Sequence, residues 1–299
     1  MPIQEAAVPS PRSWQITDAR TLDFDDPVEN LQVRVVNGTV NVVGTEGPGA
    51  RVEVSEVQGP PLLVTREGSS LVIAYEDVPW KGFLKWLDRK GWNRKAVVSV
   101  SVPARVRLSV GVVGAAAFVS GITGRTDIRG VSGDTTLVGL TGPVRADTVS
   151  GDVEAQGLAG ELDFNSVSGN LTLIDGHAGA VRADSVSGDM ILDLDPGGRE
   201  GGPAPARGMD VGLATVSGAV AVRLTSPVDA VVEAGSASGG VSSAFEELKV
   251  EGMWGAQKAT GTLGSGGGRI KADSVSGSIA LLRRATPHDD ETPHFSKDV

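Results

Sequence analysis

The sequence predicts an all-β fold, a single-stranded β-solenoid (β-helix) with about 18 residues per coil. The first observation is compositional, because 41 Gly and only 4% aromatic residues leave few large side chains to fill a compact core. The second is a Val-Ser-Gly repeat whose glycines, at positions 133, 151, 169 and 188, are spaced by 18, 18 and 19 residues. The third is the alternation of apolar and polar residues between these turns, which is typical of strands with one buried face.

The repeat divides into two halves of nine residues, each with room for one short strand. A second series of glycines, at positions 124, 142, 160 and 179, lies nine residues before the first. Short strands that wind in this way stack at the spacing of neighbouring strands, about 4.8 Å. Four columns of mostly apolar residues are expected to form one continuous core: Thr126, Val144, Leu162, Val181 and Ile270; Ile128, Ala146, Phe164, Ala183 and Ala272; Thr135, Val153, Leu171 and Met190; and Leu137, Ala155, Leu173 and Leu192.

The valine of the repeat predicts one more core column. Val131, Val149, Val167, Val186 and Val275 occupy equivalent positions at five coils. A buried charge without a partner costs several kcal/mol, so the substitution Val167→Asp is expected to be severely destabilising.

The rest of the repeat predicts its turns. Serine can bond its own turn backbone, glycine can supply a positive φ, and the Asp or Asn at positions 134, 152, 170 and 189 can close an Asx turn. We expect Gly133, Gly151, Gly169 and Gly188 to stack on one edge at successive coils.

A column of outward charges alternates in sign from coil to coil. Asp127, Arg145, Asp163 and Arg182 predict a ladder of opposite charges, each pair contributing about 0.2–1 kcal/mol. A polysaccharide lyase on a β-helix would use residues of the same types, and Arg145, Asp163 and Arg182 form the one such cluster. The charge ladder explains that cluster more simply.

We expect residues 12–284 to form one elongated solenoid, with irregular strands over 12–107 and regular repeats over 108–284. Asn37-Gly38 is a strong hairpin signal, which leaves two alternatives for the first 75 residues: hairpins that cap the solenoid, or early coils. The other expected irregularities are an inserted loop over 195–208, a flexible bend over 264–268 and a disordered tail over 285–299.

One basic and aromatic segment, residues 78–95, breaks the repeat. It holds three of the five tryptophans and six basic residues against one acid. Its apolar residues recur at helical spacing, which predicts a short amphipathic helix that caps the solenoid, docks on a partner protein or lies on an anionic membrane surface. The candidate interaction surface consists of Trp80, Lys81, Phe83, Leu84, Lys85, Leu87, Arg89, Lys90 and Trp92.

Composition argues against several classes of function. A net charge of −10 and a pI near 4.9 provide no basic field for nucleic acid, which we do not expect as a partner. The absence of cysteine excludes disulfides, thiolate metal sites and cysteine nucleophiles. The N-terminal residues lack the apolar run of a secretory signal, so we expect a cytoplasmic protein.

No constellation of residues predicts catalysis, a metal site or a cofactor. The Asp/Asn column lacks the denser pattern of calcium-binding solenoids. Thr148, Ser166, Ser185, Thr215 and Ser274 are interpreted as an exposed column, but no base that would activate a nucleophile lies nearby in the pattern. The three histidines, at positions 177, 288 and 294, lack metal-ligand spacing. We therefore expect a protein that is not an enzyme and holds no cofactor.

The recurrent ADTVSGDVEA, NSVSGNLTL, ADSVSGDMIL and KADSVSGSIALL resemble the bacterial putative-adhesin family of toastrack-type β-strand repeats, over roughly residues 28–284. The resemblance implies a β-helix, with relatives attached to membrane helices or found beside envelope-stress regulators. The expected function is a non-catalytic interaction scaffold with an unknown protein partner, cytoplasmic or peripheral at the inner membrane face, and linked to cell-envelope stress or membrane-surface signalling. The alternatives are a cell-surface adhesin and, more distantly, a carbohydrate-active β-helix enzyme.

Overall fold

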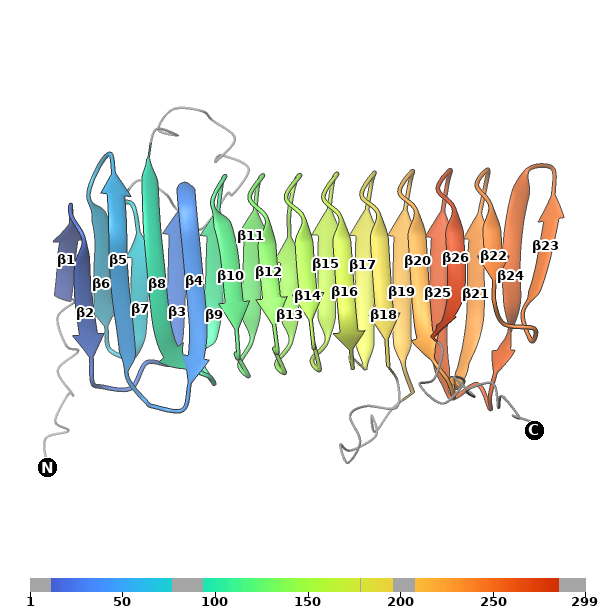
Figure 1. Cartoon of the computed structure of the whole chain (residues 1–299), viewed down its shortest axis with the longest axis horizontal. Helices are drawn as coiled ribbons and strands as arrows, with labels where there is room; N and C mark the ends of the chain where they lie inside the picture. Colours follow the sequence, from blue (N-terminus) through green and yellow to red (C-terminus); the bar gives the residue numbers. More distant parts are fainter. Residues whose placement is uncertain (1–11, 77–93, 178, 196–207, 285–299) are drawn as a thin grey trace, which may run out of the picture.

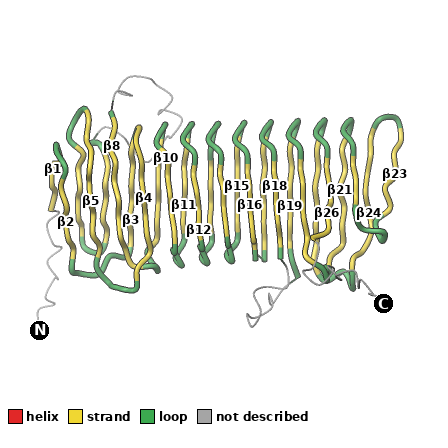
Figure 2. Tube along the Cα trace, in the orientation of Figure 1, coloured by secondary structure: helices red, strands yellow, loops and turns green. Residues whose placement is uncertain are grey.

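The computed structural model describes residues 12–76, 94–177, 179–195 and 208–284. These residues form 26 strands joined by turns and loops, with no helix among them (Figure 2). The strands lie in two long sheets that face each other along the molecule (Figure 1). The expected all-β fold is confirmed, and most of the strand pairs in both sheets are parallel.

Sheet A has 14 strands, in the spatial order β1 (Arg12–Ile16), β6 (Leu62–Glu67), β7 (Ser70–Ala74), β3 (Asn30–Val35), β9 (Arg107–Val112), β11 (Thr126–Gly130), β13 (Val144–Asp147), β15 (Leu162–Ser166), β17 (Ala180–Ser185), β19 (Asp210–Thr215), β25 (Gly268–Ser274), β21 (Ala230–Ser236), β24 (Ala256–Leu263) and β23 (Lys249–Met253).

Sheet B has 12 strands, in the spatial order β2 (Arg20–Phe24), β5 (Ala50–Gln58), β8 (Lys95–Pro103), β4 (Asn37–Thr45), β10 (Ala116–Ser120), β12 (Thr135–Val138), β14 (Val153–Gln156), β16 (Leu171–Gly176), β18 (Met190–Leu194), β20 (Val220–Thr225), β26 (Ile279–Arg284) and β22 (Val241–Ser243).

In the middle of the molecule the chain alternates between the sheets, and each sheet A strand with the sheet B strand that follows it forms one coil. Neighbouring coils pair in parallel, so that Val144 lies between Thr126 of the coil before and Leu162 of the coil after. The turns from sheet A to sheet B lie along one edge, the upper edge in Figure 1, and the returning turns lie along the opposite, lower edge.

The core runs continuously between the two sheets. All four predicted inward columns are buried in it, including Ile128, Phe164 and Leu137 with no exposed surface. Alternation with a period of two therefore identified the inward face correctly along the regular strands.

The N-terminal end combines a coil with antiparallel strands. Strands β3 and β4 pair in parallel with β9 and β10, as an ordinary coil does. Beyond them, β1 pairs antiparallel with β6 and β6 with β7, while β2 and β8 pair antiparallel with β5. Asn37-Gly38 is therefore a corner between the two sheets and not a hairpin, because the apolar residues of β3 and β4 point into the core from opposite sheets.

The coils at the C-terminal end are stacked out of chain order. Strands β25 and β26, residues 268–284, lie between the coil of β19 and β20 and the coil of β21 and β22. The chain reaches this place after the hairpin of β23 and β24, which extends sheet A at the end of the molecule (Figure 1).

The bend at residues 264–268, expected to be flexible, is organised by one carboxylate. Asp229 accepts hydrogen bonds from the Gly267 amide at 2.9 Å and from the Ser265 hydroxyl at 3.0 Å. These bonds stabilise the ionised form and lower the pKa of Asp229. The bend leads directly into β25 and so helps to place the out-of-order coil.

Candidate functional site

The serines of the Val-Ser-Gly turns join neighbouring coils along the upper edge. The Val131 carbonyl accepts both the amide of Ser150, at 2.8 Å, and its hydroxyl, at 3.1 Å. The same pair of hydrogen bonds recurs at successive coils. Around the out-of-order coil it joins Ser276 to Val216 and Ser238 to Val275. Both lone pairs of each valine carbonyl thereby accept a hydrogen bond. We expected the serine to bond its own turn, but it bonds the preceding coil.

The glycines of the motif are stacked on this edge, as predicted, but for a different reason. A methyl group on Gly151 would overlap the carbonyl oxygen of Gly133, and the same holds from each stacked glycine to the one before it. Their φ angles are not positive; in these coils a positive φ occurs at Gly139 and Gly157 on the lower edge. Glycine is needed here for the close approach of two backbones.

The polar residues on either side of the motif are also used structurally. The Asp152 side chain accepts the amide of Asn170 at 2.8 Å, and the same bond passes from coil to coil, so these residues link coils and do not close Asx turns. The Ser185 hydroxyl accepts the Gly188 amide at 2.9 Å, and the equivalent glycine amides are accepted by the hydroxyls of Ser166, Thr215, Ser236 and Ser274.

The Ser/Thr column, interpreted as exposed, is in fact inside. Thr148, Ser185, Thr215 and Ser274 are buried, and Ser166 is partly buried. The reason is the strand period, since these residues continue the inward alternation of their strands. Four of them accept the amide of their turn glycine, whereas Thr148 donates to the Ser166 hydroxyl at 3.1 Å.

The valine of the motif consequently points outward at most coils. Val131 is buried and Val149 is partly buried, but Val167, Val186, Val216 and Val275 are each between 46% and 53% exposed. The predicted core column is therefore wrong at Val167, Val186 and Val275, and Val216, at the equivalent position of another coil, is exposed as well. Val167→Asp is now expected to have little effect on stability, because the carboxylate can reach water.

These four residues, the valine row, follow one another without a gap. The serine after each valine bonds the valine carbonyl of the preceding coil, in the pairs Ser187 to Val167, Ser217 to Val186 and Ser276 to Val216. Successive valines of the row therefore lie on neighbouring coils. At the spacing of neighbouring strands, the row is about 14 Å long. It is continuous only because the out-of-order coil places Val275 beside Val216.

The lower edge shows that this fold can bury apolar turn residues. Ile122, Leu140 and Leu158 occupy its turns and have no exposed surface. Ile191 on sheet B, which is also half exposed, stands alone between Thr172 and Ala221. In the described coils, the side chains of these four valines are thus the one part of the repeated motif that neither bonds nor packs between coils.

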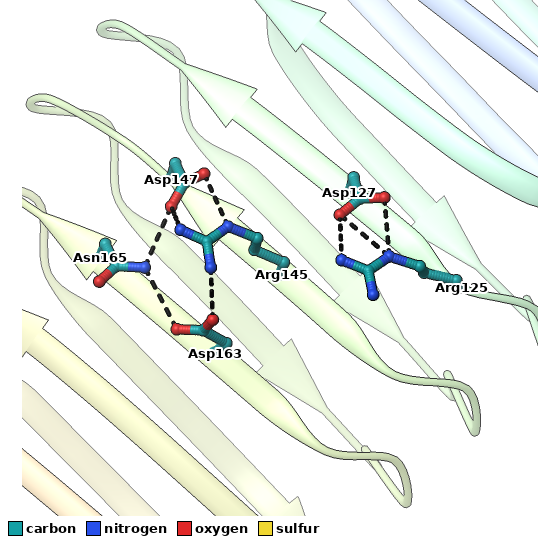
Figure 3. A network of polar contacts seen from close by, with 6 residues as sticks. All are labelled: Arg125, Asp127, Arg145, Asp147, Asp163 and Asn165. Atoms are coloured by element: carbon teal, nitrogen blue, oxygen red, sulfur yellow. Dashed lines mark hydrogen bonds and ion pairs between the residues drawn. The ribbon is translucent and has the colours of Figure 1, made fainter.

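The outer face of sheet A carries the predicted charges, most of them paired (Figure 3). Arg145 forms ion pairs with Asp163 on the next coil and with Asp147 on its own strand, the latter at 2.9 Å, and the bond to Asp147 raises its pKa. Arg125 pairs with Asp127 at 2.9 Å. The Arg145–Asp163 rung of the ladder is present, whereas Asp127 pairs with Arg125, the residue just before its own strand.

These charges surround a shallow depression of about 240 Å³, lined by Arg125, Arg145, Arg182, Glu161, Asp163 and Asp210. Three cations face three carboxylates, so the depression has no net charge that would select an ionic ligand. The paired Arg145 and Asp163 explain the cluster as a structural ladder of exposed ion pairs.

The candidate surface in the basic segment, from Trp80 to Trp92, lies outside the described residues. The residues that flank it contact the rest of the protein. Tyr75 is buried, and the Arg94 guanidinium lies 5.3 Å from the centre of the Tyr75 ring. The Asn37 side chain donates a hydrogen bond to the Arg94 carbonyl at 3.1 Å. Lys95, which we assigned to the segment, is the first residue of β8 and pairs with Glu56 at 2.9 Å. Tyr75 follows β7 of sheet A and Arg94 precedes β8 of sheet B, so both of these flanking residues lie on the upper edge.

The described residues hold no group of three or more His, Asp or Glu side chains that could bind a metal ion. Nor do they contain a helix long and apolar enough to cross a membrane.

No protein-family model matches the sequence, and no curated protein matches it. Solved structures with a similar chain path include a putative adhesin from Bacteroides fragilis, with 13% identity over 89% of this chain and 98% of that one and a TM-score of 0.46. Others are a putative cell adhesion protein from Clostridium sporogenes, with 14% identity over 89% and 100% and a TM-score of 0.28, and a putative lipid binding protein from Parabacteroides distasonis, with 11% identity over 90% and 98% and a TM-score of 0.39. Values this low carry no information on what this chain binds.

Sequence reasoning missed a second exposed region, at the C-terminal end of the molecule. Trp254, in the turn between β23 and β24, is 98% exposed, and Met253, the last residue of β23, is 72% exposed. The available signal was the pair Trp254-Gly255 between two runs of strand-forming residues, which is a turn with an aromatic residue where a polar one is usual.

Proposed function

We propose that this chain is a non-catalytic binding scaffold whose valine row docks an apolar surface of another protein. The supporting observation is the half exposure of four stacked valines on an edge where the serines and the acidic residues of the repeat bond neighbouring coils and the glycines pack against each other. Contiguous apolar surface on a soluble protein is typical of interaction sites, whereas isolated exposed residues are not.

The rigidity of the edge favours this role. Each row residue is held by a strand before it and a serine bond after it, so a partner would meet a surface that needs little ordering on binding. Preorganised surfaces lose less conformational entropy when a complex forms.

A variant in which all four row valines become threonine tests the proposal. Threonine has nearly the shape of valine, and the side chains are half exposed, so we expect less than about 0.5 kcal/mol of change in unfolding free energy per position. Leu140→Ala on the lower edge, where the side chain is fully buried, should cost about 2–5 kcal/mol. Thermal and denaturant unfolding measure both.

The same variant then reports on binding. The tagged wild-type protein, recovered from its native cells, should retain a partner that the threonine variant loses. A control variant with Ile191→Thr and Leu282→Thr, two exposed apolar positions outside the row, should retain it. Equal recovery with the threonine variant would contradict the proposal.

A second candidate partner is an anionic membrane surface, contacted by the basic segment. The described residues on either side of the segment, Tyr75 and Arg94, lie on the same edge as the valine row. Basic residues near such a surface contribute about 1 kcal/mol each. We expect salt-sensitive binding to vesicles rich in anionic lipid, and weak binding to neutral vesicles. Changing Lys81, Lys85, Arg89 and Lys90 to Ser should abolish it, while absence of binding by the wild type at low salt would rule this partner out.

We also propose a location at the cytoplasmic face of the inner membrane and a link to cell-envelope stress. Support for this comes from the resemblance of the repeats and from the sequence of the basic segment. Fractionation of native cells into cytosol, membrane and exterior tests it, and recovery in the exterior fraction would favour the cell-surface adhesin instead.

A further inference from the structure

Strand β23 leaves one edge of sheet A open at the end of the molecule (Figure 1). It pairs with β24 on one side, and all five of its residues are exposed. The neighbouring edge strand of sheet B is treated differently: β22 has three residues, and the Val241 amide donates to the Gln257 side chain at 2.6 Å. In the described part of the chain no side chain caps β23 in this way. Natural proteins usually protect such edges, because an open edge can pair with another strand.

The turn at the end of β23 has an unusual residue. Met253 pairs with Ala256, so the turn consists of Trp254, with φ of 53°, and Gly255, with φ of 91°. These angles belong to a type I′ hairpin turn, whose first position favours Asn, Asp or Gly. A bulky residue with positive φ is strained, and no contact within the described protein compensates for an indole that is 98% exposed. Strain of this kind at an exposed tip is a mark of a functional site.

The hairpin geometry determines which backbone groups of β23 face the open edge. In a two-residue hairpin the pair next to the turn, here Met253 and Ala256, is hydrogen-bonded, and bonded and non-bonded pairs then alternate. Val250 and Gly252 fall in non-bonded pairs, so their amides and carbonyls point away from β24. Any strand added to this edge must therefore bond to Val250 and Gly252.

We propose that a second copy of this chain occupies the edge, with the two β23 strands antiparallel about a twofold axis at Val250. In this register the Val250 residues of the two copies exchange both backbone bonds. Lys249 of each copy lies directly opposite Glu251 of the other, in the non-bonded pairs where side chains approach most closely. The next allowed register, with Val250 opposite Gly252, would place Glu251 against Glu251 and is unfavourable.

The charges on the face of sheet A continue this pattern. Lys258 of β24 forms an ion pair with Glu233 of β21 at 2.6 Å. On its other side, Lys258 lies opposite Glu251 of β23. The proposed pairing adds Lys249 of the second copy, so the sign alternates over four successive strands. The strand is thus complementary in charge to itself. This inference concerns a different surface from the valine row and does not depend on the proposed function.

Charge exchange tests the register. Lys249→Glu should weaken dimerisation at least about tenfold, because two attractive pairs become repulsive. The double variant Lys249→Glu with Glu251→Lys restores both pairs and should restore the dimer. Sedimentation equilibrium over a range of concentrations measures the association, and thermal unfolding checks that each variant is folded.

A single engineered cysteine tests the twofold axis. The chain has no cysteine, and the α-carbons of a bonded antiparallel pair lie about 5.5 Å apart, within the range of a disulfide. Val250→Cys should give a disulfide-linked dimer on mild oxidation, and Ile191→Cys, on the exposed outer face of sheet B, should not.

The strained turn provides a separate readout. Trp254→Gly removes the strain, so it should leave the thermal midpoint unchanged or raise it. A wild-type protein that sediments as a monomer at all concentrations, with no more crosslinking at position 250 than at position 191, would overturn the proposal.

Discussion

Gly151→Ala is expected to destabilise the protein by about 3 kcal/mol, at the upper end of what an added methyl group costs in a packed interior. The new methyl would overlap the backbone carbonyl of Gly133, which cannot rotate away as a side chain could. Relief would require the two coils to separate and would break the bonds from Ser150 to Val131. Denaturant unfolding measures the loss.

Gly212→Ala is the matched control for this substitution. Gly212 lies in β19 with open space around its missing side chain and no positive φ, so alanine should be neutral or slightly stabilising. Equal effects of the two substitutions would show that the coils are not in close backbone contact on the upper edge.

Ile270→Ala is expected to cost about 2–5 kcal/mol, as for a large side chain removed from the middle of a core. Ile270 is fully buried in β25 and pairs with Val211 on one side and Val232 on the other, although the three residues are far apart in the chain. The control is Val231→Ala, half exposed on the next strand, which should change stability by about 0.5 kcal/mol or less. A loss at Ile270 as small as the control's would mean that the last coil is not stacked between two others.

The sequence was sufficient to identify the regular strands and their part of the core because the strand period of two determines which residues face inward. The valine row was missed although the same rule contained it. Thr126 and Ile128 face inward, and continuing by two reaches Gly130 and its equivalents Thr148, Ser166 and Ser185, which places the valine that follows each of them outside. We interpreted the small polar residues as exposed and the valine as buried, which contradicts the alternation. This interpretation did not consider that a buried hydroxyl can accept a hydrogen bond from a turn amide.

The order of the coils could not be predicted from the repeats. Each Val-Ser-Gly turn offers the same serine, carbonyl and glycine to its neighbour, so the turn at Val275 fits equally well beside Val216, Ala237 or the end of the stack. The antiparallel β23–β24 hairpin and the Asp229-organised bend determine its place, and neither interaction has a signature in the repeat.

The measurement that most directly tests the role of the valine row is site-specific photo-crosslinking in native cells. A photoreactive residue at Val186 or Val216 should crosslink to the same partner, and one at Ile191 or Leu282, similarly exposed but outside the row, should not. Crosslinks of equal strength at all four positions, or none at the two valines, would contradict the assignment of this edge as the binding surface.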